Sequence, residues 1–65
     1  MSRRNDAAKH NNDGNIAYKK KKYADAIEFY TNALQLQPDF AVVYSNRAQA
    51  LYQQRRYSHL AGTGR

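Results

Sequence analysis

An internal repeat constrains the fold of this 65-residue chain more than any other feature of its sequence. When the sequence is aligned with itself at an offset of 34 residues, residues of similar character pair with each other. The aligned pairs are Ala7 with Ala41, Asn12 with Asn46, Gly14 with Ala48, Ala17 with Leu51, Tyr18 with Tyr52, Lys21 with Arg55, Lys22 with Arg56 and Tyr23 with Tyr57. A period of this length is typical of stacked helical units, each of which buries its apolar face against a neighbour.

Apolar residues recur at helical spacing and predict three helices, over residues 6–22, 24–37 and 39–56. The second segment is the clearest, because its apolar residues follow one another at intervals of three and one rather than in the alternation of a strand. The predicted fold class is therefore all-α. A chain of this length forms one domain at most, and such a small domain is marginally stable.

Residues with strong backbone preferences mark the ends of these helices. Pro38 disfavours helical geometry at the preceding residue and so ends the second helix. Asp39 comes directly after it and is predicted to cap the third helix. That helix is predicted to end near Arg56, because Gly62 and Gly64 break or fray any helix in the last nine residues.

Gly14 stands in the middle of the first predicted helix, where it costs roughly 1 kcal/mol relative to alanine. A glycine at this place indicates the close approach of another backbone. Six tyrosines lie near the apolar stripes, and a place in the helical core is favoured over a platform that stacks nucleic-acid bases. They are Tyr18, Tyr23, Tyr30, Tyr44, Tyr52 and Tyr57.

The residue types present do not form a catalytic or metal-binding pattern. The chain has no cysteine, and His10 and His59 lack the spacing of metal ligands. No Ser/His/Asp arrangement and no glycine-rich phosphate loop occurs, and Asp25 and Glu28 are interpreted as acids on a solvated helix face. We therefore predict that the chain is not an enzyme and uses no metal, cofactor or small-molecule substrate.

Charge is distributed unevenly along the chain, whose net charge is +6. Residues 1–22 carry seven Lys or Arg against two Asp, residues 23–40 carry three acids and no base, and residues 41–65 carry four Arg and no acid. The run Lys19–Lys22 is interpreted first as a solvated helix end and next as a contribution to an acidic-partner site. A basic, nucleic-acid-associated helical protein is the alternative function, supported by charge alone.

The sequence predicts no membrane segment. It has no run of 18 or more apolar residues, the length that a spanning helix requires. Residues 1–15 are polar and lack the apolar core of a secretory signal. A cytoplasmic location is predicted, with the nucleus as the alternative.

Specific residues of both units resemble the tetratricopeptide repeat (TPR) family. The first unit matches in full, with its small residues, its aromatic and its closing proline, and the second matches in its first helix only. The matching residues are Gly14, Asn15, Ile16, Ala17, Tyr18, Lys19, Tyr23–Ile27, Tyr30, Ala33, Leu34 and Pro38, then Tyr44–Ala48, Leu51, Tyr52 and Tyr57. The resemblance implies an antiparallel TPR hairpin plus a third helix, an incomplete right-handed α-solenoid that binds proteins.

Within that family, this chain resembles the N-terminal repeats of co-chaperones. Those proteins hold acidic chaperone tails ending in Glu-Glu-Val-Asp with a carboxylate clamp on the groove formed by the first helices. The resemblance places Asn15 and Asn46 at two of the clamp's five positions. Asn11 occupies the position of the clamp's first lysine, so that charge is missing, and Lys9 lies nearby. It implies a peptide-binding site at Asn11, Asn15 and Asn46, and a heat-shock chaperone tail as partner.

The second repeat departs from the family because no second helix comes after its first. The predicted organisation is a single partial domain with a polar tail (1–5), a first repeat (6–38), an incomplete second repeat (39–61) and a tail (62–65). Because repeat units cannot bury their apolar faces alone, the sequence is interpreted as a fragment of a longer array or a truncated product.

We expect the isolated chain to be partly molten or to self-associate through its uncovered third helix, since that helix lacks a partner. A thermal melt monitored by circular dichroism at several chain concentrations tests this. A sharp melt that is independent of concentration would contradict the expectation.

Overall fold

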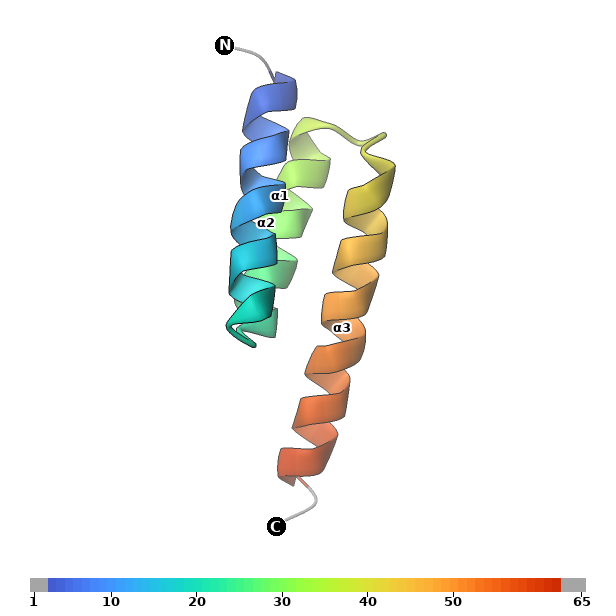
Figure 1. Cartoon of the computed structure of the whole chain (residues 1–65). Coiled ribbons are helices and arrows are strands. Elements are labelled where there is room, and N and C mark those ends of the chain that lie inside the picture. Colours follow the sequence, from blue (N-terminus) through green and yellow to red (C-terminus); the bar gives the residue numbers. More distant parts are fainter. Residues whose placement is uncertain (1–2, 63–65) are drawn as a thin grey trace.

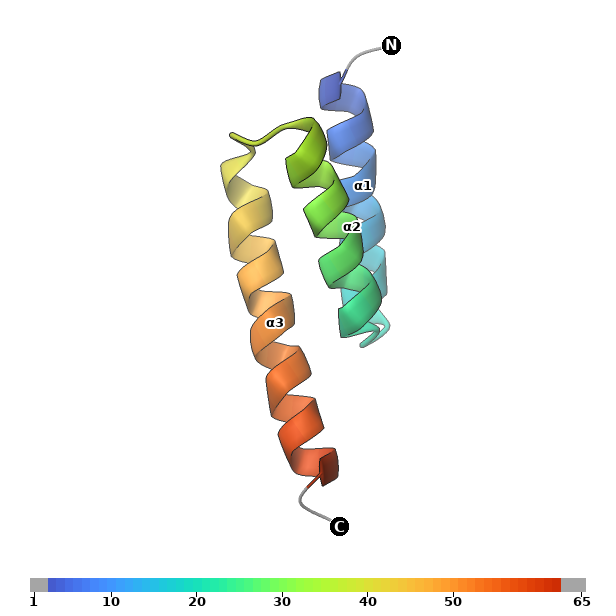
Figure 2. The same cartoon turned by 180° about the vertical axis from the view of Figure 1, so that it is seen from behind.

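The computed structural model describes residues 3–62 and consists, over that range, of three helices and no strand (Figure 1). They are α1 (Arg3–Lys19), α2 (Tyr23–Leu36) and α3 (Ala41–Gly62). α1 and α2 form an antiparallel hairpin, and α3 returns along α2 and extends beyond it (Figures 1 and 2). α2 packs against both neighbours, whereas α1 and α3 touch only sparsely. The predicted all-α class is confirmed.

The helix bounds differ from the predicted ones mainly at the ends. α1 begins at Arg3 instead of Asp6 and ends at Lys19 instead of Lys22, so residues 3–5 are helical and not part of a tail. Residues 1–2 and 63–65 lie outside the described range, as do the side chains of residues 3–4 and 59–62. The expectation that His59 is not a metal ligand therefore lies outside the described residues, as do residues 63–65 of the tail predicted at 62–65.

The prediction that the third helix ends near Arg56 is wrong, because α3 continues to Gly62. Nothing between these residues forbids helix, since a glycine costs only about 1 kcal/mol and no proline occurs after Pro38. Tyr57 also supports the extension: its ring stacks on Tyr23 of α2, with 5.4 Å between centroids. Tyr23 in turn meets Tyr18 of α1 edge to face at 5.2 Å, so one aromatic cluster joins the three helices.

The core between the helices consists largely of alanine, which lets the helix backbones come close together. Tyr30 and Val43 are the largest side chains that are fully buried. The buried apolar residues among those described are Ala7, Ala17, Ala26, Tyr30, Ala33, Leu34, Val43 and Ala50. Of the six tyrosines only Tyr30 is buried, and the prediction of a core position is wrong for Tyr44, Tyr52 and Tyr57, which are exposed because the described chain covers each of these rings at most in part.

Gly14 marks the closest contact between α1 and α2. A Cβ atom built on it would lie 2.5 Å from Cε1 and 2.7 Å from Cδ1 of Tyr30. The predicted close approach is therefore present, but the group that approaches is an aromatic side chain and not a backbone. The Tyr30 ring therefore sets the position of α2 against α1. It occupies the space that a side chain at position 14 would need.

The turn from α1 to α2 is closed by two backbone hydrogen bonds. The amide of Lys22 donates to the carbonyl of Ala17 at 2.9 Å, and the amide of Lys21 donates to the carbonyl of Tyr18 at 2.9 Å. This pair of bonds defines a Schellman motif, whose closing residue adopts left-handed geometry and is usually glycine. Here it is Lys21, with φ of 63°.

The turn from α2 to α3 uses Pro38, which was predicted to end the second helix, and Asp39, which was predicted to cap the third. Phe40 donates its amide to the carbonyl of Gln37 at 3.1 Å, so Pro38 and Asp39 form the turn itself. α3 begins at Ala41, which makes Phe40 and not Asp39 the residue before the helix. The Tyr44 hydroxyl donates to the Pro38 carbonyl at 2.9 Å and ties α3 back to this turn.

Substitution of Gly14 tests the α1–α2 contact. Gly14→Ala should lower the free energy of unfolding by about 1–3 kcal/mol, because overpacking at the Tyr30 ring outweighs the better helix propensity of alanine. Urea unfolding monitored by circular dichroism measures the change. In a Tyr30→Leu background the same substitution should cost less or stabilise; an equal loss in both backgrounds would refute the steric account.

Substitution of Lys21 tests the left-handed turn. A left-handed non-glycine residue costs roughly 1–2 kcal/mol, so Lys21→Gly should raise the free energy of unfolding. It also removes an ammonium 5.8 Å from the Tyr57 ring, a contact worth about 0.5–1 kcal/mol, which leaves a net gain of up to about 1.5 kcal/mol. Lys20→Gly is the control and should lower stability, because its φ is not positive. Thermal melts that shift in the same direction for both variants would contradict the assignment.

Candidate peptide-binding site

Two asparagines link α1 to α3 directly. The Nδ2 amide of Asn46 on α3 donates to Oδ1 of Asn11 on α1 at 3.0 Å, and both side chains are half-buried. Since α1 and α3 otherwise make few contacts, this bond fixes how the two helices face each other. The sequence predicted both residues in a binding site, but not their contact with each other.

A third asparagine is held from α2. The Tyr30 hydroxyl donates to Oδ1 of Asn15 at 2.5 Å. The absence of a side chain at Gly14 lets the Tyr30 ring pass over α1 to reach the next residue. Burial, and to a smaller extent the neighbouring Tyr18, raises the pKa of Tyr30 above its usual range, so the phenol keeps its proton further into the alkaline range.

The three asparagines lie on one side of the molecule. Asn11 and Asn15 are four residues apart on α1 and so share a helix face, and Asn46 reaches that face from α3. Their oxygens on α1 are occupied as acceptors, whereas each amide nitrogen carries two hydrogens and keeps at least one for a ligand. The arrangement therefore presents donors, which suit a carboxylate or a peptide carbonyl.

Positive charge lies around this site rather than within it. Lys9 is two residues from Asn11, about 200° around the helix, so it does not take the place of the missing clamp lysine. Arg47 is also directed elsewhere: its Nη1 donates to Thr31 Oγ1 at 3.4 Å, and its guanidinium lies 5.7 Å from the Tyr44 ring. The asparagines are thus the polar groups that the fold brings together here.

Tyr30 is the member of this site that sequence reasoning placed only in the core. Its hydroxyl is the feature that could have indicated this role. A buried tyrosine usually finds a hydrogen-bond partner, whereas a phenylalanine would fill the same space without one.

No group of three or more His, Asp or Glu residues within residues 3–62 is placed to hold a metal ion. No helix in that part of the chain is long and apolar enough to cross a membrane.

The helical hairpin with a returning third helix and a 34-residue period defines an α-helical repeat protein. The model of the family described as TPR repeat matches residues 14–54, more than half of the chain. The chain belongs to the TPR family and is a module for protein–protein interaction. No solved structure matches it.

Several curated proteins are similar to parts of the chain. DnaJ homolog subfamily C member 7 homolog of Schizosaccharomyces pombe is 56% identical over 63% of the chain. Hsp70-Hsp90 organizing protein 3 of Arabidopsis thaliana is 37% identical over 78%, and small glutamine-rich tetratricopeptide repeat-containing protein beta of Rattus norvegicus is 45% identical over 72%. The matches cover 9%, 9% and 14% of these relatives' own lengths.

The bond from Tyr30 to Asn15 gives a prediction for alkaline pH. Because the folded-state pKa of Tyr30 is raised, its contribution to stability is present below pH 10 and is lost as the pH rises through the folded-state value. Tyr30→Phe should lower the free energy of unfolding at pH 7 by about 1 kcal/mol and reduce the alkaline loss. Urea melts at pH 7 and above pH 10 measure both effects. An alkaline loss of unchanged size would exclude Tyr30 as its source.

Proposed function

We propose that the chain binds acidic C-terminal peptides of protein partners, in the manner of a co-chaperone adaptor, at Asn11, Asn15 and Asn46. The observation that carries the proposal is the joint presentation of three amide donors by α1 and α3. A terminal carboxylate accepts hydrogen bonds strongly, and bonds to a charged group contribute about 1.5–3 kcal/mol.

The relatives support the choice of partner. The name of the Arabidopsis protein refers to organizing Hsp70 and Hsp90, and that of the fission-yeast protein to the DnaJ group. A chaperone tail ending in Glu-Glu-Val-Asp supplies a carboxylate terminus flanked by acids. The chain, with net charge +6, attracts such a tail over a distance as well.

Titration of a fluorescent peptide ending in Glu-Glu-Val-Asp, at about 150 mM salt, tests the proposal because charges beyond about 8 Å are screened there. Asn15→Ala and Asn46→Ala should each weaken binding by about tenfold or more, because each removes a donor to a charged group. Asn12→Ala is the matched control: Asn12 is exposed on α1 between the site residues, and its loss should change the affinity less than twofold.

Two further ligands distinguish recognition of a terminal carboxylate from binding by charge and from nucleic-acid binding. The same peptide with an amidated C-terminus lacks the terminal charge and should bind at least tenfold more weakly. A single-stranded oligonucleotide of equal charge tests the alternative of a nucleic-acid-associated protein. Binding of the oligonucleotide but not of the peptide would overturn the proposed function.

A further inference from the structure

Three tyrosine rings meet where the end of α3 lies against the α1–α2 turn. The rings of Tyr23 and Tyr57 are stacked, with 5.4 Å between their centroids and 28° between their planes. Tyr18 meets Tyr23 differently, because its ring is inclined by 72° and the pair is edge to face. Two phenols that are 34 residues apart in the sequence are therefore held face to face.

The hydroxyl ends of the stacked pair are close together as well. Loss of hydration raises the pKa of Tyr23 above its usual range, and the phenol of Tyr57, which is near enough to interact with the Tyr23 hydroxyl, raises it further. The ring carbons next to each hydroxyl lie at the same end of the ring, so these ortho carbons of the two side chains also approach each other. The pair is thus placed for a reaction between those carbons.

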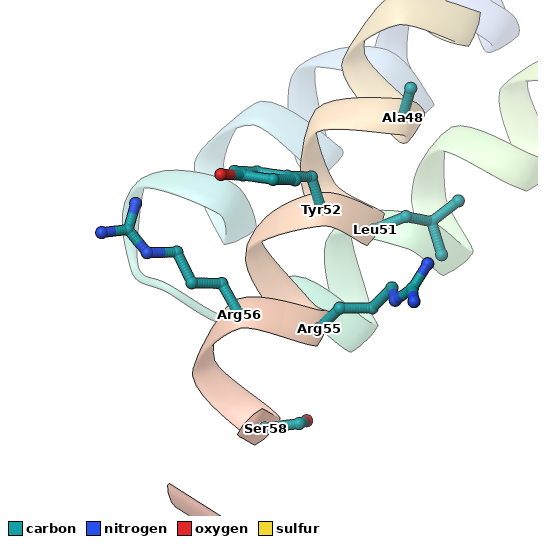
Figure 3. Close-up of a pocket in the computed structure, with 6 residues that line it drawn as sticks. All are labelled: Ala48, Leu51, Tyr52, Arg55, Arg56 and Ser58. Carbon is teal, nitrogen blue, oxygen red and sulfur yellow. The ribbon is translucent and has the colours of Figure 1, made fainter. Parts of the chain in front are cut away.

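Exposure decides which phenols an oxidant in solution reaches. Tyr57 is 43% exposed, although one face of its ring lies on Tyr23. Tyr52 is more exposed, at 62%, but its ring has no stacked partner among the described residues. Figure 3 shows the Tyr52 side chain directed to the same side of α3 as Arg56. The stacked pair therefore combines a phenol that is accessible with a second phenol in contact with it.

We propose that Tyr23 and Tyr57 form a site of oxidative modification, at which hydrogen peroxide and a haem peroxidase join the two rings as dityrosine. Each phenol loses one electron and one proton to the oxidant, and the two tyrosyl radicals form a bond between their ortho carbons. The hydrogens on those carbons then move to the oxygens, which restores both phenols. In sum, two phenols and one hydrogen peroxide give one dityrosine and two molecules of water.

Contact between the rings favours this product over a link between two chains. A radical formed on exposed Tyr57 can pass to Tyr23, which leaves Tyr57 free to be oxidised a second time. Both radicals then lie side by side in one molecule, and such a reaction is far faster than one that requires two molecules to meet.

The new bond would join the start of α2 to the far end of α3. Tyr23 is the first residue of α2, and Tyr57 lies near the end of α3 that extends beyond the hairpin (Figure 1). A covalent link there restricts the unfolded chain in the way that a disulfide does. It also holds α3 to the hairpin at the end opposite the α2–α3 turn. Oxidation therefore stabilises the arrangement of the three helices.

Treatment of the whole chain with hydrogen peroxide and a haem peroxidase tests the proposal. The blue fluorescence of dityrosine should appear in the monomer fraction, and its yield per chain should stay the same on about tenfold dilution, because the reaction is intramolecular. Tryptic digestion and mass spectrometry should give two peptides joined through Tyr23 and Tyr57, lighter by two hydrogens than the separate peptides together.

Conservative substitutions identify the reacting pair. Tyr23→Phe and Tyr57→Phe keep an aromatic ring in the stack but lack the phenol oxygen, and each should lower dityrosine in the monomer by about tenfold or more. Tyr52→Phe is the matched control, since it removes a more exposed phenol and should change that yield by less than about twofold. Tyr18→Phe removes the edge-to-face neighbour and should also leave the product in place.

Two results would overturn the proposal. One is dityrosine that occurs only in dimers and is lost with Tyr52→Phe, because it would come from collisions between exposed rings. The other is a cross-linked monomer that persists in Tyr57→Phe. A thermal melt of the purified cross-linked monomer tests the structural effect: its melting temperature should rise by about 10 °C or more over that of the untreated chain. An unchanged melting temperature would contradict the stabilisation of α3 by the link.

Discussion

The contact between Gly14 and the ring of Tyr30 is the interaction on which the rest of this small structure depends. With no Cβ on α1 at that point, the ring lies against the helix backbone and brings α2 close enough for a core made mainly of alanines. The hydroxyl of the same side chain donates a hydrogen bond to Asn15. One buried side chain therefore sets the distance between two helices and fixes a polar group on their surface.

That contact also explains why the two halves of the repeat differ so much in exposure. The first unit is closed because α2 covers α1, whereas the second has a first helix with the same spacing of apolar residues and no described cover. Tyr44 and Leu51 are thus exposed although their pattern is that of core residues. Tyr57 is covered in part, because its ring stacks on Tyr23 near the α1–α2 turn. This contact holds the extended part of α3 to the hairpin.

Most of the fold was predictable because it depends on local rules that act along the chain. Apolar spacing indicated the three helices, and Pro38 ended α2 within one residue. Gly14 indicated a close approach, although the approaching group is the Tyr30 ring and not the predicted backbone. The end of α3 was not predictable in the same way, because it depends on the contact of Tyr57 with a residue 34 positions away. The tyrosines of α3 were misplaced for a related reason: periodicity shows which face is apolar, but not whether anything covers it.

The candidate site was predictable in its members but not in its chemistry. Resemblance to a family selected Asn11, Asn15 and Asn46, and the structure brings Asn11 and Asn46 together. No sequence pattern indicated that two of the asparagines serve as acceptors inside the protein. These bonds use one lone pair on Oδ1 of Asn11 and of Asn15 and leave the amide hydrogens of both, which favours a donor role for these two side chains toward a ligand.

The orientation of α3 decides how the candidate site at the asparagines is arranged. α3 is placed by packing of Val43 and Ala50 against the core, by the bond from Tyr44 to Pro38 and by the bond from Asn46 to Asn11. A helix held along only one side has fewer contacts to resist displacement than a helix packed on both. The position of Asn46 relative to Asn11 therefore depends on how firmly α3 is held. Contacts that hold α3 in place also preorganise the candidate site at the asparagines.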